Sequence, residues 1–204
     1  MRTALKRAFD VAIAVGMAPL AVPLVLAIGA LARLETPGPV IFRQTRVGRR
    51  GAAFTIYKLR TMVDNAANIG AGLYSTANDP RYTRVGIFTR RWSLDELPQL
   101  YNVFVGDMSV VGPRPVLKST VDEYQNEYDT ILQVRPGLTG LSQVNGRNLL
   151  SRRDRLKLDM HYAREWSFAM DLRILCRSIV VVLTGDGQTN SQSRADVEGE
   201  QRGS

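Results

Sequence analysis

An apolar run near the start of the chain most strongly limits what this sequence can fold into. Residues 11–32 are 22 consecutive residues without a charged side chain. A helix of about 20 apolar residues is long enough to cross the hydrocarbon core of a bilayer. A cleaved signal peptide fits less well, because its apolar region is shorter and ends at a small-residue cleavage site. The run therefore predicts a membrane helix.

Two features of the run argue against a simple span. Pro19 and Pro23 lie inside it, and each proline removes a backbone donor and disfavours helical geometry in the residue before it. Basic residues stand on both flanks, among them Arg7 and Arg33, and the positive-inside rule places both flanks in the cytoplasm. A re-entrant helix hairpin, broken at Pro23, satisfies both observations. A kinked span and a core helix of a soluble protein are the alternatives.

Composition narrows the chemistry that the chain can carry. Its 204 residues have a formal net charge of +8, which suits nucleic acid, anionic lipid or a phosphorylated substrate. The single cysteine, Cys176, excludes an intrachain disulfide. The single histidine, His161, excludes a His-rich zinc site and argues against a Ser-His-Asp triad. An activity of this chain would therefore rely on carboxylates and cations.

After the apolar run, the sequence predicts a small, mainly helical α+β domain. Short strands are expected at residues 40–42 and 54–57, on either side of a basic turn, and together they predict a β-hairpin. A further short strand is expected at residues 109–111. Apolar residues at helical spacing predict helices over residues 87–92, 93–104, 118–134, 151–166 and 172–183. The helix at 118–134 is amphipathic enough to lie on a core or at a membrane interface.

The chain is expected to have three parts. We predict a re-entrant membrane helix at residues 1–34, a cytoplasmic catalytic domain at residues 35–185 and a polar tail at residues 186–204. The tail has no aromatic residue, and its composition is typical of disorder. Because of the membrane helix at residues 1–34, the lipid bilayer is an expected partner.

Two adjacent carboxylates, Asp95 and Glu96, are the most informative feature of the predicted domain. Ser93 and Glu96 have the spacing of a capping box, in which each side chain accepts a backbone hydrogen bond at a helix start. The pair would then lie in the first turn, where the helix dipole favours negative charge. An aspartate held ionised in this way is also a candidate nucleophile, and its glutamate neighbour could hold a metal or a proton. On this motif alone, capping is the commoner explanation.

Several cations stand beside turns or at the ends of predicted elements. These candidate phosphate ligands are Lys58, Arg60, Arg91, Arg114, Arg135 and Arg147. A nucleic-acid-binding surface usually shows a clustered basic stripe with interleaved aromatic residues, which this sequence does not show. Separate cations around one acidic pair instead predict a pocket for phosphates and a divalent ion.

The segment at residues 134–148 has the composition of a ligand-binding loop. It contains three glycines, two arginines and small polar residues, including Thr139 and Gln143. Glycines allow a backbone to approach a ligand closely. The spacing matches neither a Walker loop nor a dinucleotide fingerprint. We add Thr139 and Gln143 to the candidate substrate-binding residues.

The order of several motifs resembles that of a known family. The chain is similar to the small monotopic phosphoglycosyl transferases, which are bacterial sugar transferases, over residues 5–185. The matching motifs are KRAFD (6–10), TPGP (36–39), QTRVG (44–48), YKLRTM (57–62), SLDELPQL (93–100), GDMSVVGPRP (106–115), RPGLTG (135–140) and QVNGR (143–147). One departure is Glu35-Thr36-Pro37, where the family more often has Asp-Ser-Pro.

The resemblance implies a specific reaction. Such enzymes move a sugar-1-phosphate from a UDP-sugar to polyprenyl (undecaprenyl) phosphate at the cytoplasmic face of the bacterial inner membrane. Asp95 would attack the phosphate nearer the sugar, form a covalent phosphosugar ester and release UMP. Mg²⁺, held by Asp95 and Glu96, would neutralise charge on the diphosphate. The family's helix break would fall on Pro23.

Other interpretations belong to other classes of protein. A non-catalytic membrane-surface scaffold would use Asp95 and Glu96 only as a helix cap. A basic nucleic-acid-binding protein would show salt-sensitive binding to DNA or RNA. We expect the transferase and no nucleic-acid partner, and a homodimer is a candidate assembly.

Overall fold

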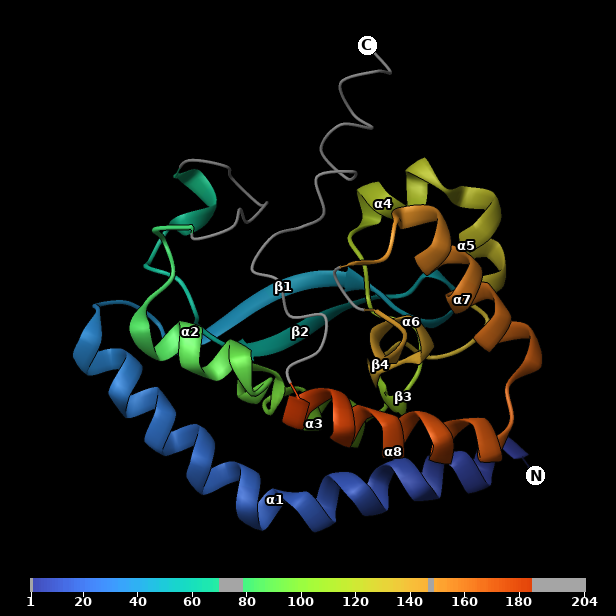
Figure 1. Ribbon diagram of the computed structural model, residues 1–204, viewed down its shortest axis with the longest axis horizontal. Helices are drawn as coiled ribbons and strands as arrows, with labels where there is room; N and C mark the ends of the chain where they lie inside the picture. The colour runs from blue at the N-terminus through green and yellow to red at the C-terminus, as the bar shows by residue number, and fades with distance from the viewer. Residues whose placement is uncertain (1, 70–78, 147–148, 185–204) are drawn as a thin grey trace.

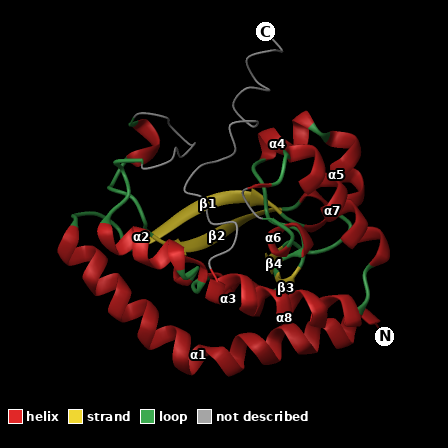
Figure 2. Cartoon of the chain, viewed as in Figure 1, coloured by secondary structure: helices red, strands yellow, loops and turns green. Residues whose placement is uncertain are grey.

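A long helix, α1 (Arg2–Glu35), forms the base on which the rest of the chain packs (Figure 1). The computed structural model describes residues 2–69, 79–146 and 149–184. Above α1, the other helices surround two small sheets, as Figure 2 shows. The expected mixed, helix-rich architecture with one long apolar N-terminal helix is confirmed. The predicted tail at 186–204 lies outside the described residues.

Helix α1 runs through both of its prolines. Pro19 and Pro23 lie inside the continuous helix, and the ribbon bends midway so that its two arms diverge (Figure 1). A proline removes one backbone hydrogen bond and crowds the preceding turn, and a helix can accommodate this as a bend. The predicted break at Pro23 into two separate helices is therefore not confirmed.

The two sides of α1 differ in side-chain size. Ala14, Ala21 and Ala32 are buried against the domain, whereas Leu20 and Leu34 are 71% and 83% exposed. These small side chains bring the helix close to the domain. Ile28 is buried as well, but many of the large apolar side chains are exposed. By length and composition, the helical residues Ala4–Glu35 could cross a membrane. Exposed apolar surface of this extent indicates membrane association and argues against a core helix.

The domain holds the N-terminal arm of α1 through polar contacts. The Arg7 guanidinium donates to the carbonyls of Val103 (2.5 Å) and Phe104 (2.6 Å). The buried Asp10 carboxylate accepts from the Ser109 hydroxyl (2.9 Å) and from the backbone N–H of Val110 (3.0 Å). These contacts give the KRAFD motif a structural role.

The same domain also holds the C-terminal end of α1. The Arg60 guanidinium donates to the carbonyls of Ala32 (3.1 Å), Thr36 (2.8 Å) and Pro37. The Glu35 carboxylate accepts from the backbone N–H groups of Arg84 (2.6 Å) and Val85 (3.0 Å), which begin the next helix. Glu35, the departure from the family pattern, thus caps a helix N-terminus, where negative charge is favourable.

The predicted β-hairpin is confirmed, with longer strands. Strands β1 (Ile41–Val47) and β2 (Ala53–Leu59) are antiparallel, and Val47 pairs with Ala53. The turn η1 (Arg49–Gly51) joins them and contains the positive φ angles of Arg50 (58°) and Gly51 (79°). Positive φ costs glycine little, which suits it to this turn.

A second, parallel pair of strands forms the centre of the domain. Strand β3 (Ser109–Val111) was predicted, but its partner β4 (Gly137–Thr139) lies in the segment interpreted as a loop. The backbones approach so closely that a Cβ added to Gly137 would lie 2.1 Å from the Gly112 nitrogen. Val111 and other buried apolar residues form the core around this pair.

The remaining helices follow the apolar pattern with some exceptions. The segment predicted as one helix at 93–104 consists of a 3₁₀ turn (Leu94–Glu96) and a shorter α-helix (Gln99–Val105). The segment predicted as one helix at 118–134 is divided at Tyr124 into α4 and α5, and α6 lies in the predicted loop. The elements are η2 (Ala66–Asn68), α2 (Arg84–Arg91), η3 (Leu94–Glu96), α3 (Gln99–Val105), α4 (Lys118–Glu123), α5 (Gln125–Ile131), α6 (Leu141–Val144), α7 (Arg152–Glu165) and α8 (Phe168–Thr184).

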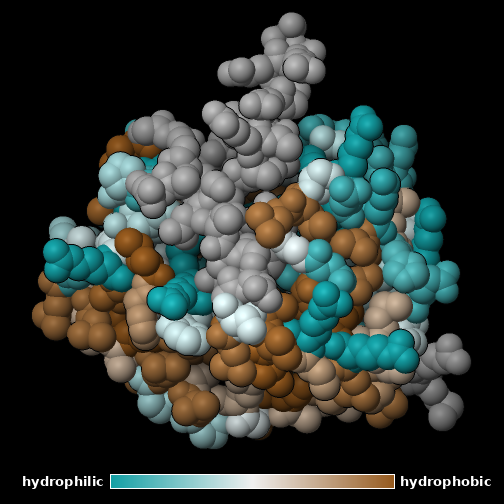
Figure 3. Space-filling model, in the orientation of Figure 1, coloured by the Kyte–Doolittle hydropathy of each residue, from teal (hydrophilic) through white to brown (hydrophobic). Residues whose placement is uncertain are grey.

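Exposed apolar side chains gather on the helices beside α1. Figure 3 shows hydrophobic surface over α1 and α8, and mostly hydrophilic surface over α4, α5 and α7. The exposed apolar residues include Phe88 of α2, Phe104 of α3 and Leu183 of α8. An apolar side on several neighbouring helices is typical of a surface that contacts lipid.

Candidate active site

The acidic pair lies in η3, a single turn of 3₁₀-helix, and not at the start of α3. Ser93 has a left-handed backbone (φ 54°), and its side chain makes no capping hydrogen bond to that turn. The α-helix begins only after Pro98. The predicted capping box is therefore wrong, because Pro98 lacks an N–H and is better suited to the helix start. The Glu96 carboxylate is engaged by cations instead.

Glu96 is held by two cations from different elements. The Lys58 ammonium of β2 lies 2.7 Å from Glu96 Oε1, and Nη1 of Arg114, in the turn after β3, lies 3.4 Å from the same oxygen. Burial lowers the pKa of Lys58, although the Glu96 charge opposes the shift. The structure thus brings together three of the predicted site residues, which are up to 56 positions apart in the chain.

Asp95 is buried and differently placed. It is 7% exposed, and within the part of the chain that the structure describes no hydrogen bond reaches its carboxylate. Burial and the charge of Glu96 raise its pKa to about 6, while Lys58, Arg90 and Arg114 act in the opposite direction. The expected stabilisation by a helix dipole is absent because no α-helix starts here. A carboxylate with unoccupied oxygens suits a nucleophile.

A pocket opens beside the acidic pair. It encloses about 250 Å³, part of which is open to solvent. Burial and the neighbouring Arg114 lower the pKa of Arg46 to about 10, so Arg46 keeps its charge at neutral pH. The lining holds three basic side chains, Arg46, Lys58 and Arg114, and one carboxylate, Glu96. Such an excess favours an anionic ligand. The lining residues are Arg46, Ile56, Lys58, Glu96, Gln99, Arg114, Pro115, Gly137 and Leu138.

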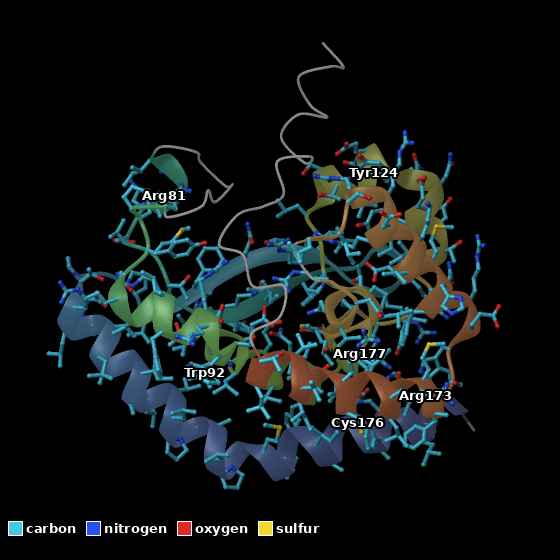
Figure 4. The ribbon with its side chains drawn as sticks, in the orientation of Figure 1. Arg81, Trp92, Tyr124, Arg173, Cys176 and Arg177 are labelled. Carbon is cyan, nitrogen blue, oxygen red and sulfur yellow. The ribbon has the colours of Figure 1, made fainter. Side chains whose placement is uncertain are left out.

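Arg60 and Arg91 are not brought into the pocket. The buried Arg60 guanidinium donates to the backbone at the end of α1, as described above. The Arg91 guanidinium lies 5.7 Å from the centre of the Trp92 ring, and Figure 4 shows Trp92 on the side of the domain where α1 lies. The structure therefore gives Arg60 a position in the anchoring of α1, and Arg91 one beside an aromatic ring.

The candidates of the 134–148 segment also lie apart from the lining. Arg135 Nε donates to the Gly106 carbonyl at 2.9 Å, and the Thr139 and Ser178 hydroxyls are 2.6 Å apart. Gln143 Nε2 donates to the carbonyl of Leu138 at 3.1 Å, and Leu138 is one of the residues that line the pocket. Arg147 lies outside the described residues. Of these contacts, the one from Gln143 to Leu138 supports the backbone of the pocket wall.

Sequence reasoning missed three residues at the site. Arg46 and Gln99 line the pocket, and Arg90 lowers the pKa of Asp95. Arg46 lies in the QTRVG motif and Gln99 in SLDELPQL, so the motifs contained the signal. Periodicity could not select them, because a polar residue in a strand or at a helix start usually faces solvent.

The acidic pair has the donor chemistry of a magnesium site. Mg²⁺ is usually bound by one or two carboxylates, completed by water and substrate phosphates. Asp95 and Glu96 supply two carboxylates, and the raised pKa of Asp95 shows that a nearby cation would be favourable. Among the described residues no group of three or more His, Cys, Asp or Glu side chains gathers for a metal. The residues fit a magnesium ion that is shared with a phosphorylated ligand.

Comparisons with known proteins agree with these observations. The chain is 42% identical over 188 residues to the uncharacterized sugar transferase EpsL of Bacillus subtilis, covering 91% of this chain and 92% of that protein. It is 44% identical over 190 residues to the UDP-glucose:undecaprenyl-phosphate glucose-1-phosphate transferase of Caulobacter vibrioides, covering 89% and 70%. It is 39% identical over 197 residues to the undecaprenyl-phosphate galactose phosphotransferase of Salmonella typhimurium, covering 90% of this chain but 41% of that protein.

The family assignment rests on a match that extends over most of the chain. The model of the bacterial sugar transferase family matches residues 1–185, which include α1, both sheets and the pocket. The resemblance seen in the motifs is thereby confirmed. The chain belongs to the bacterial sugar transferase family of enzymes.

Proposed function

We propose that this chain is a phosphoglycosyl transferase that moves a sugar-1-phosphate from a UDP-sugar to undecaprenyl phosphate and releases UMP. The observation that carries the proposal is the buried Asp95 carboxylate, which receives no hydrogen bond from the described residues and lies beside a cationic pocket. The names of the Caulobacter and Salmonella relatives support the choice of substrates.

The residues suggest a reaction in two displacements. Asp95 attacks the phosphorus nearer the sugar, the bond to the UMP oxygen breaks, and an aspartyl-phosphosugar ester forms. The phosphate of the lipid then attacks the same phosphorus, which frees the Asp95 carboxylate and yields the lipid-linked diphosphosugar. Lys58 and Arg114 stabilise charge on the phosphoryl oxygens and hold Glu96 in place. When bound, Mg²⁺ would neutralise part of the diphosphate charge.

The position of Asp95 suits the first step. A nucleophile with few hydrogen bonds loses little stabilisation when it attacks. The charges of Lys58 and Arg114, which contact Glu96, oppose the repulsion between the two carboxylates and act to lower the pKa of Asp95. Glu96 is therefore a positioning residue and, with Asp95, a proposed metal ligand.

We also propose that α1 enters the membrane and returns, with the catalytic domain on the cytoplasmic face of the bacterial inner membrane. The N-terminal arm of α1 is held through Arg7, and its other end is held through Arg60, both by the same domain. A domain that holds both ends of a helix supports a topology in which both ends are on one side. The basic residues on both flanks support the cytoplasmic side.

A UMP-release screen tests the reaction. Purified protein would be incubated with a panel of UDP-sugars, undecaprenyl phosphate and Mg²⁺. We expect UMP release with at least one sugar, and a fall of about 10⁶-fold in Asp95→Asn, the order of loss seen when a nucleophile is removed. Asp122→Asn, an exposed carboxylate of α4, is the matched control and should keep its activity. If Asp95→Asn released UMP at the wild-type rate, the covalent mechanism would be excluded.

Single cysteines test the topology. Thr3→Cys, near the start of α1, and Thr45→Cys, in β1 beyond the end of α1, are each made in a Cys176→Ala background. We expect a membrane-impermeant maleimide to label both positions from the cytoplasmic side only. Labelling from opposite sides would show that α1 spans the bilayer.

A further inference from the structure

Two side chains in the pocket have donors that the protein itself does not use. Gln99, the first residue of α3, is 2% exposed, and its Nε2 is buried without a hydrogen-bond partner in the described chain. Burying an amide donor without a partner is unfavourable. Since Gln99 lines the pocket, the natural partner of its amide is a bound ligand.

Arg46 of β1 is the second such residue. Its Nη2 donates to Gln44 Oε1 (2.6 Å) and its Nη1 lies 3.4 Å from the Pro115 carbonyl, whereas Nε is buried without a partner. Both acceptors are neutral, and over the described ranges no carboxylate forms an ion pair with Arg46. A guanidinium remains charged at neutral pH. Arg46 therefore brings a positive charge to the pocket that no described carboxylate neutralises through an ion pair.

The other two cations of the pocket, Lys58 and Arg114, already have a carboxylate partner. Lys58 and Arg114 share the Glu96 carboxylate. An additional ligand for Arg46 and Gln99 must then supply negative charge and several acceptor oxygens within one small space. A phosphoryl group has this chemistry, and arginine binds it with parallel hydrogen bonds.

We propose that Arg46 and Gln99 form a phosphoryl-binding subsite beside the acidic pair, in which the guanidinium and the amide of Gln99 donate to phosphoryl oxygens of a substrate. The identity of the substrate rests on the proposed function. Both substrates carry phosphoryl groups, the donor as a diphosphate and the acceptor as a monophosphate. The subsite also explains why Arg46 Nε and Gln99 Nε2 are both buried in the lining of one pocket without a partner among the described residues.

Three variants test the subsite. Arg46→Gln removes the charge, and Gln99→Met removes the amide at nearly constant volume. Arg43→Gln is the matched control, because Arg43 lies on the same strand and is exposed. Thermal unfolding of each variant would show that it folds, and Arg46→Lys, which keeps the charge but not the fork of donors, replaces Arg46→Gln if that variant does not fold.

The KM of each substrate is measured separately. We expect a rise of about 10- to 100-fold for Arg46→Gln and about 10-fold for Gln99→Met, as for loss of a hydrogen bond to a charged group. A rise confined to the UDP-sugar assigns the subsite to the donor diphosphate, and a rise confined to undecaprenyl phosphate assigns it to the acceptor. Values within twofold of wild type for both substrates in both variants would overturn the proposal.

A binding measurement separates this inference from the proposed reaction. If the wild-type protein releases no UMP from any UDP-sugar, the proposed function fails, and pyrophosphate binding is then measured by calorimetry. Binding by wild-type protein that Arg46→Gln weakens at least tenfold would support the subsite. Equal binding by both proteins, or none by wild type, would overturn it.

Discussion

Two lysine–carboxylate pairs in this molecule have similar lengths and different surroundings. Lys6 lies 2.6 Å from Asp171, and Lys58 lies 2.7 Å from Glu96. Asp171 is fully buried, and its oxygens also contact the Tyr162 hydroxyl (2.7 Å) and the Trp166 N–H (3.0 Å). Every oxygen of Asp171 thus has a partner, and the network joins the start of α1 to α7 and α8.

The pocket is arranged in the opposite way. Its carboxylates are adjacent, Asp95 receives no hydrogen bond from the described residues, and Arg46 and Gln99 have unused donors. A satisfied buried network rigidifies a fold, whereas an unsatisfied one destabilises it unless a ligand completes it. The comparison separates a pair whose carboxylate is fully satisfied within the fold from a pair that stands beside unused donors.

The largest expected difference in unfolding free energy is between Asp171→Asn, in the satisfied network, and Asp95→Asn, beside the pocket. Asp171→Asn leaves the Lys6 ammonium without its counter-ion and should cost about 3–5 kcal/mol of unfolding free energy. Asp95→Asn should not lower stability, because burial already disfavours its charge. Chemical denaturation in detergent measures both. A destabilised Asp95→Asn together with a fully stable Asp171→Asn would reverse the comparison.

The next effect concerns activity. Lys58→Met removes the 2.7 Å contact to Glu96 and leaves the longer contact from Arg114, and kcat/KM should fall about 100-fold, as when one charge-stabilising donor is removed. Lys118→Met is the control, because Lys118 makes an ion pair of 2.6 Å that is exposed to solvent. A Lys58→Met enzyme with more than half of the wild-type kcat/KM would show that Glu96 does not need this partner.

A third buried carboxylate sharpens the comparison through pH. Burial raises the pKa of Asp159 to about 7, so the folded protein retains a proton that the unfolded chain releases above about pH 4. Stability should therefore fall as pH rises from about 4 to 7 and then level off. Asp159→Asn should remove this loss and stabilise the protein by about 2 kcal/mol at pH 8, with little effect at pH 4. Equal stabilisation at both pH values would exclude Asp159 as the titrating group.

The smallest effect tests the placement of Arg60. Arg60→Lys loses the fork of donors that holds the carbonyls at the end of α1 and should cost about 1–2 kcal/mol. The KM for UDP-sugar should stay within twofold, because Arg60 does not line the pocket. Arg33→Lys, an exposed arginine that contacts the Gly38 carbonyl, is the control for stability. A large change in KM would restore Arg60 to the substrate site.

Features that depend on neighbouring residues could be predicted from the sequence. The hairpin β1–β2, the strand β3 and the helices α7 and α8 follow from local periodicity and turn residues. The meeting of Lys58 and Arg114 with the acidic pair was expected from turn-mounted cations and from the family motifs.

Features that depend on distant partners could not. Strand β4 exists only through pairing with β3, and its Gly-rich sequence favours a loop. Arg60 was assigned to the substrate because no local pattern shows that the end of α1 lies beside it. The Ser93 capping box failed because the α-helix begins only after Pro98, two positions past Glu96.

The hydrogen bonds from Arg60 to the end of α1 also limit the distance between α1 and the acidic pair. Arg60 holds the end of the helix, and Lys58, which contacts Glu96, lies two residues earlier on the same strand. Two residues of extended chain span about 7 Å. The short covalent link between Lys58 and Arg60 thus limits the distance between the acidic pair and the end of α1. If α1 enters the bilayer as proposed, this link holds the acidic pair at a set distance from the membrane surface, where the phosphate of a lipid substrate is located.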